Sequence, residues 1–206
     1  MKSLLSAPSE DDLIRLLKAW RFWLAGAIVG ALVGAALFYV APPPYRARAT
    51  VNVDFHLEQA WPQNTDREQF YYLERETRKL EEVAFSDVTL GVVLDRVPGV
   101  EIQALRDGKL QLSQPGNGGW HFYAVDASAQ TAAALASAWA QSFTDQAKSQ
   151  LAASQGGLEP YITVDPAQTT DIGAARFPGQ ALYISIGAIA LLAVGALGVL
   201  FLNTKP

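Results

Sequence analysis

The chain has 206 residues, half of them apolar, and a formal net charge of −4. Residues 42–180 hold 11 lysines and arginines against 17 aspartates and glutamates, a balance that argues against nucleic acid as a ligand. The sequence contains no cysteine, which excludes disulfides, thiolate zinc sites and cysteine nucleophiles. We expect no cofactor.

The first segment, residues 1–21, predicts a cytoplasmic amphipathic helix. Ser9 is followed by three acidic residues, a pattern typical of a capped helix start. A helix lying on anionic headgroups uses basic residues on its polar side and aromatic residues at the interface. The residues expected to do so here are Arg15, Lys18, Trp20 and Arg21. The simpler alternative is a solvated helix that only leads into the membrane.

Two uncharged segments predict transmembrane helices, at residues 22–41 and 181–202. The first ends in Ala-Pro-Pro-Pro, a poor cleavage site, so we expect a retained anchor and not a signal peptide. The basic residues beside the spans place both termini in the cytoplasm, including a tail at residues 203–206. The expected location is therefore the cell (inner) membrane, with residues 42–180 outside.

Small residues and prolines mark both spans. Gly26, Gly30 and Gly34 recur every fourth residue, which puts them on one face and favours close helix packing. The second span carries Gly187 and Gly195. Packing of the two spans against each other and self-association of two copies both fit this pattern. The expected membrane-entry residues are Pro42, Pro43, Pro44 and Tyr45 after the first span and Pro178 before the second.

The central segment predicts an α+β extracytoplasmic domain, with a small mixed sheet packed with helices. Period-two alternation indicates strands at 45–55, 109–114, 120–125 and 161–164. Helices are expected after a capping box at Thr65, after Ser86 or Asp87, and over 127–153 after an Asp126 cap. Residues 57–63 are expected as a loop, and 100–105 fit either a hairpin strand or a short helix. The expected buried stripes are Phe70, Leu73, Thr77 and Leu80 on the first helix and Leu135, Trp139 and Phe143 on the last.

No arrangement of side chains in the sequence indicates catalysis. His56 and His121 lack a third ligand at a typical spacing, which favours structural histidines. The adjacent carboxylates point in different directions on a helix, and no nucleophile elbow is present. Sugar stacking and core packing both explain five aromatic residues: Trp61, Tyr71, Tyr72, Trp120 and Tyr123. We therefore expect a protein that is not an enzyme.

The order of these parts resembles the polysaccharide co-polymerase family, the Wzz or chain-length-determinant proteins. The resemblance begins at residues 12–17 (DLIRLL) and continues through the first span to residues 41–53 (APPPYRARATVNV). Looser similarities follow at residues 85–88 (FSDV), at Asp126 with residues 133–137 (AALAS), and at Ala175 with Pro178. Ser137 stands where the family pattern has asparagine, and the central segment is too short for the long arm of the larger members.

The resemblance implies a non-enzymatic scaffold that contacts membrane lipid, forms a homo-oligomer and regulates the length, polymerisation or export of a cell-surface polysaccharide. The partner would be the polysaccharide polymerase or export machinery. The alternative is an adaptor of a cytoplasmic tyrosine kinase. The chain contains no Gly-x-x-x-x-Gly-Lys-Ser/Thr motif, so such a kinase would be a separate chain. A third hypothesis, an unrelated membrane-anchored hydrolase or binding protein, lacks support from a catalytic motif.

Overall fold

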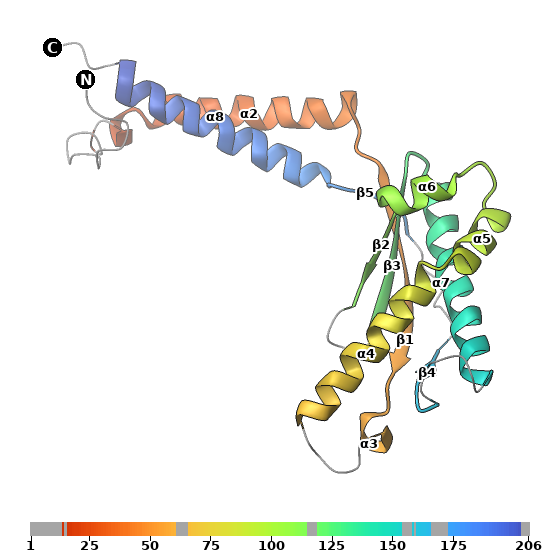
Figure 1. The fold of residues 1–206 in the computed structure, drawn as a ribbon. Coiled ribbons are helices and arrows are strands. Elements are labelled where there is room, and N and C mark those ends of the chain that lie inside the picture. Colours follow the sequence, from red (N-terminus) through yellow and green to blue (C-terminus); the bar gives the residue numbers. More distant parts are fainter. Residues whose placement is uncertain are drawn as a thin grey trace. The chain divides into compact units, whose positions relative to one another are not determined.

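The computed structural model describes residues 14, 16–60, 66–114, 119–153, 158, 160–165 and 173–202. It divides into two compact units. One unit comprises Met1–Pro43 and Arg176–Pro206, and the other comprises Pro44–Ala175. Within the first unit, helices α2 (Trp20–Val40) and α8 (Gln180–Leu202) pack along each other (Figure 1). The second unit contains the sheet and the remaining helices.

Helices α2 and α8 are both long and apolar enough to cross a membrane. This confirms the two predicted apolar helices and fits a two-pass membrane protein. Helix α2 begins at Trp20, two residues before the predicted span, because Trp20 and Arg21 continue the same helix. Helix α8 begins one residue before the prediction, at Gln180.

The sheet of the second unit is small and antiparallel. Its strands are β1 (Tyr45–Asp54), β2 (Leu110–Ser113), β3 (Gly119–Asp126) and β4 (Thr163–Val164), in the order β2-β3-β1-β4. The two-residue strand β5 (Ala175–Arg176) also pairs with β1. The expected mixed sheet is wrong, because β3 lies between β1 and β2 and runs opposite to both. The α+β class itself is confirmed.

One face of the sheet forms the core with the helices. The side chains of β1 that point inward are Ala47, Ala49, Val51 and Val53, as the alternation predicted. Helix α7 (Ala129–Ala152) lies along the strands and buries the predicted stripe of Leu135, Trp139 and Phe143 (Figure 1). The small side chains of β1 and the alanines of α7 let the helix approach the sheet closely.

Helices α4 (Asp66–Ala84) and α5 (Asp87–Arg96) pack against α7. Ser86 caps α5 as predicted, because its side chain accepts a hydrogen bond from the Thr89 N–H at 3.2 Å. The predicted stripe on α4 is confirmed at Leu80, which is fully buried, and wrong at Phe70, which is 63% exposed; Leu73 and Thr77 are half-buried. The buried residues of α4 are Tyr72, Glu76, Leu80, Val83 and Ala84.

Two further expectations are corrected and one alternative is decided. The expected loop after β1 begins with the short helix α3 (Leu57–Ala60). Of the two alternatives for residues 100–105, the short helix is confirmed as α6 (Ile102–Ala104). It is followed by the kinked turn η1 (Leu105–Lys109), in which Gly108 has a φ of +122°. Ser128 and not Asp126 caps α7, while the Asp126 carboxylate accepts a hydrogen bond from the Ser128 N–H.

Several predicted features lie outside the described residues. They are the Ser9 cap, Arg15, Trp61 and the Thr65 cap.

Candidate functional site

The glycines of α2 lie directly against the backbone of α8. A Cβ atom at Gly26 would lie 2.8 Å from the carbonyl oxygen of Leu191. A Cβ atom at Gly30 would overlap the Gly187 carbonyl, and one at Gly34 would overlap the Tyr183 carbonyl. Because only glycine leaves room for this approach, the two backbones pack without intervening side chains.

The glycines of α8 make the reciprocal contacts. A Cβ atom at Gly187 would overlap the carbonyl of Gly30, and one at Gly195 would lie 3.2 Å from the Cα of Trp23. The structure therefore places all five predicted glycines along one contact between α2 and α8 of the same chain. Self-association of two chains, the other alternative, would have to use another face of this helix pair.

Aromatic and polar residues gather where α2 ends and α8 begins. The Phe38 ring packs edge-on against Tyr183, with ring centroids 5.6 Å apart, and the Arg176 guanidinium lies 5.7 Å from the Phe38 centroid. Gln180 donates a hydrogen bond to the Tyr39 hydroxyl at 3.3 Å. Aromatic residues of this kind are enriched at membrane–water interfaces.

The predicted membrane-entry residues lie at the two junctions between the apolar helices and the second unit. Pro42 and Pro44 are exposed and Pro43 is buried, and Tyr45 is the first residue of β1. Pro178 is half-buried two residues before α8 begins, and its peptide bond with Phe177 is cis.

The predicted interfacial residues that the structure describes lie near the start of α2. Lys18, Trp20 and Arg21 are exposed, and the Arg21 guanidinium lies 5.7 Å from the Trp20 ring centroid. Residues 16–18 are helical and a turn at Ala19 precedes α2. The Trp23 indole N–H donates to the Leu16 carbonyl at 3.0 Å, which ties this turn to the first residues of the apolar helix.

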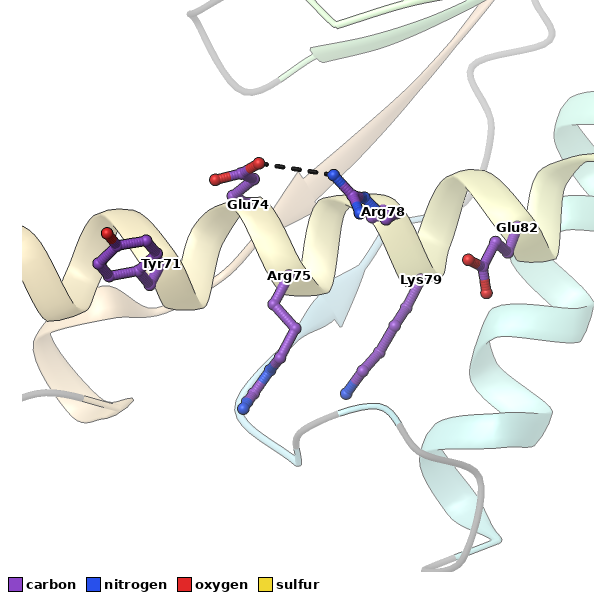
Figure 2. Close-up of a pocket in the computed structure, with 6 residues that line it drawn as sticks. All are labelled: Tyr71, Glu74, Arg75, Arg78, Lys79 and Glu82. Atoms are coloured by element: carbon purple, nitrogen blue, oxygen red, sulfur yellow. Dashed lines mark ion pairs between the residues drawn. The ribbon is translucent and has the colours of Figure 1, made fainter.

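A shallow hollow of about 290 Å³ lies on the surface of α4. Figure 2 shows its lining, which comes from this one helix: Tyr71, Glu74, Arg75, Arg78, Lys79 and Glu82. Arg78 forms an ion pair with Glu74 at 3.6 Å. Arg75 and Lys79 each donate to the fully buried Glu76 at 2.8 Å. The three cations of the hollow and Glu74 thus belong to ion pairs along the helix, an arrangement that stabilises α4.

The buried Glu76 is a residue that the sequence analysis missed. A glutamate among charged neighbours gives no periodic apolar signal, so the pattern did not single out this position. The one available signal was the spacing of Glu76 and Lys79, which are three residues apart on one helix face.

Both histidines are held by threonine hydroxyls. A ring nitrogen of His56 lies 2.9 Å from the Thr163 hydroxyl, and His56 has a φ of +43°, which is uncommon for a residue other than glycine. His121 lies 3.1 Å from the Thr50 hydroxyl across the β1–β3 pair. Among the residues that the structure describes, no three His, Cys, Asp or Glu side chains form a group suited to a metal.

Burial and, second, the nearby Arg48 charge lower the pKa of His121 below its ordinary value of 6.5. The unfolded chain therefore binds more protons than the folded chain below pH 6.5, so this contribution to stability is complete above that pH and declines as the pH falls. We expect the thermal midpoint of the wild type to fall between about pH 7 and pH 5 more steeply than that of His121→Gln. Parallel pH profiles for the two proteins would contradict this assignment.

The pKa of the Asp126 carboxyl is also lowered, but here the shift favours the charged form. Its burial alone raises the pKa, but hydrogen bonds from Lys109 and from the Ser128 and Ala127 N–H groups, with the positive charge of Lys109, outweigh burial, and the pKa falls below its ordinary value of 3.8. Lys109 Nζ lies 2.7 Å from this carboxylate. The pair joins the end of η1 to the end of β3.

Comparison with protein-family models and with curated proteins gave no match to this chain.

Proposed function

We propose that this chain is a non-enzymatic, oligomeric scaffold of the inner membrane that regulates the chain length, polymerisation or export of a cell-surface polysaccharide. The observation that carries the proposal is the connectivity. The central strand β1 starts five residues after α2 ends, and the chain leaves the α+β unit through β5, which ends four residues before α8 begins. One folded unit is thus joined at both ends to a pair of closely packed apolar helices, the arrangement that the sequence resemblance implies.

The proposed topology puts both ends of the chain in the cytoplasm and the unit Pro44–Ala175 outside. The exposed cations Lys18 and Arg21 at the start of α2 support this orientation through the positive-inside rule. The helix pair would contact lipid through its exposed apolar side chains, such as Leu32 and Ile189. Copies of the chain would assemble around the polysaccharide polymerase or export machinery.

The structural roles of the titratable groups support a scaffold more than an enzyme. His56 and His121 bind threonine hydroxyls, Asp126 binds Lys109, and Glu76 binds two cations of its own helix. Groups that act in acid–base catalysis instead face a substrate site with their pKa values tuned toward the working pH.

The test is deletion of the gene in the cells that make this protein, followed by gel separation of the surface polysaccharide. We expect a changed length distribution or amount, restored by the wild-type gene. The Trp139→Ala gene, whose product should be strongly destabilised, serves as the matched control and should restore it less than the wild-type gene. An unchanged polysaccharide after deletion would rule the proposal out.

A further inference from the structure

The face of the sheet opposite the core is polar and basic. On β1 it carries Arg46, Arg48, Thr50 and Asn52, which alternate with the buried residues. Their neighbours in register on β3 are Val125, Tyr123, His121 and Gly119, and β2 adds Gln111 and Ser113. The described side chains of this face are exposed or half-buried, apart from Gly119. We call this outward-facing strip the basic face: Arg46, Arg48, Thr50, Asn52, Gln111, Ser113 and Tyr123.

Contacts across three strands hold part of the basic face in place. The Arg46 guanidinium lies over the Tyr123 ring, 3.8 Å from its centroid, and also donates to Gln111 at 3.5 Å. A guanidinium stacked on an aromatic ring is held in a fixed plane, which reduces the side-chain entropy that is lost when it binds an anion. His121, two residues before Tyr123 on β3 and on the same face, packs edge-on against the Tyr123 ring.

Arg48 is the exposed cation of the basic face. It lies two residues after Arg46 on β1 and opposite Tyr123 in register. Among the residues that the structure describes, Arg48 has no ion-pair partner. Three other exposed arginines of the unit differ in this respect, because Arg78, Arg96 and Arg106 pair with Glu74, Asp145 and Asp87.

The charge of the basic face is opposite to that of the unit around it. Residues 42–180 carry an excess of acidic residues, yet the described residues of β1, β2 and β3 place one carboxylate on this face, Asp54, at the last position of β1. Asp54 already accepts a hydrogen bond from the His56 N–H at 2.9 Å. Since charges beyond about 10 Å are largely screened at physiological salt, an anion on this face responds mainly to the two arginines.

We infer that the basic face binds an acidic polysaccharide, with a uronic-acid carboxylate at Arg48 and sugar hydroxyls at Gln111, Asn52 and Ser113. This inference rests on the proposed function and names the ligand that the proposed scaffold would bind. A carboxylate accepts paired hydrogen bonds from a guanidinium, and amide and hydroxyl side chains both donate to and accept from sugar hydroxyls. A surface that inserts into a membrane instead needs exposed apolar side chains, and the apolar Val125 on this face is half-buried.

The test uses the full-length protein in detergent micelles and two fluorescent probes of equal length, oligogalacturonate and neutral maltodextrin. We expect the wild type to bind oligogalacturonate more tightly than maltodextrin, and added salt to weaken that binding. Arg48→Gln should weaken it about tenfold, because one charge-assisted hydrogen-bond pair is lost. Arg48→Lys keeps the charge and should retain part of the affinity.

Arg78→Gln is the matched control, because it removes an equally charged, 72% exposed arginine from α4. It should leave the affinity for oligogalacturonate unchanged, and both glutamine variants should keep the wild-type thermal midpoint. Equal losses in Arg48→Gln and Arg78→Gln, no binding of oligogalacturonate, or equal binding of both probes would overturn the inference. Loss of co-purified phosphatidylglycerol in Arg48→Gln with unchanged oligogalacturonate binding would also overturn it, and would assign the face to lipid.

The outcomes for the ligand and for the function are separable. A changed polysaccharide after gene deletion, combined with no binding to the basic face, would remove the inference and keep the proposed function. Binding that Arg48→Gln abolishes, combined with unchanged surface polysaccharide after deletion, would remove the proposed function and keep the basic face as a carbohydrate-binding surface.

Discussion

Replacement of Gly30 by leucine is expected to separate α2 from α8 without preventing insertion into the membrane. A single Cβ atom at this position already overlaps the Gly187 carbonyl, so the larger side chain forces the two backbones apart. Overpacking of this kind lowers the stability of the packed state by about 1–3 kcal/mol. Leucine inserts into a bilayer at least as readily as glycine, so the amount of inserted protein should not change.

A cysteine pair reports on this separation, because the chain has no natural cysteine. The ring centroids of Phe38 and Tyr183 are 5.6 Å apart, so a short bifunctional thiol reagent should cross-link Phe38→Cys with Tyr183→Cys in the wild-type background and much less with Gly30→Leu. Ala36→Leu is the matched control, since Ala36 is exposed and its enlargement should leave the cross-link intact. Equal cross-linking in Gly30→Leu and Ala36→Leu would show that the glycines do not control the packing. A changed oligomer size in Gly30→Leu alone would extend their role to assembly.

Replacement of Trp139 by alanine is expected to cause the largest loss of stability in the α+β unit. The Trp139 side chain is fully buried between Phe122 and Phe85, with ring centroids 4.8 and 5.1 Å away. Its indole N–H donates to the Ala84 carbonyl at 2.7 Å, which ties α7 to the end of α4. Truncation of such a residue costs about 3–5 kcal/mol. The thermal midpoint, followed by near-ultraviolet circular dichroism, should fall by on the order of 10–20 °C.

Two further variants separate packing from hydrogen bonding. Trp139→Phe keeps a ring but removes the donor to Ala84, so we expect an intermediate loss of about 1–3 kcal/mol. Tyr71→Ala replaces an aromatic residue that is 56% exposed, and it should change the free energy of unfolding by no more than about 0.5 kcal/mol. If Trp139→Ala and Tyr71→Ala unfold at the same temperature, the core assigned to α7 is wrong.

The elements with regular apolar periods were predictable from the sequence. The alternation of Ala47, Ala49, Val51 and Val53 predicts both the strand and its buried face, because the apolar side of a half-buried strand packs against the core. The spacing of Leu135, Trp139 and Phe143 does the same for α7. On α4 the charged residues outnumber the apolar ones, so tertiary packing decides which side of the helix is buried. Phe70, which was expected in the buried stripe, is exposed, and the charged Glu76 is buried.

The contacts that make up the sites were less predictable. The glycine spacing on α2 indicated a packing face, but the identity of its neighbour depends on α8, far along the chain. The basic face could not be predicted from the sequence. There, Arg46 and Arg48 were only charges near the membrane, and Tyr123 was one of several aromatic residues. The antiparallel register brings Arg46 close to Tyr123 and Gln111. Pairing between strands so far apart in the sequence produces no local sequence pattern that could predict it.

The glycine contact between α2 and α8 also imposes an order on synthesis. Helix α2 leaves the ribosome long before residue 180, and at usual rates of translation the delay is on the order of ten seconds. During this time the Gly26, Gly30 and Gly34 face has only lipid or a neighbouring helix to contact. Helix α2 must therefore insert by its own hydrophobicity. In a newly made chain the glycine face of α2 is therefore exposed, whereas in the folded protein α8 covers it.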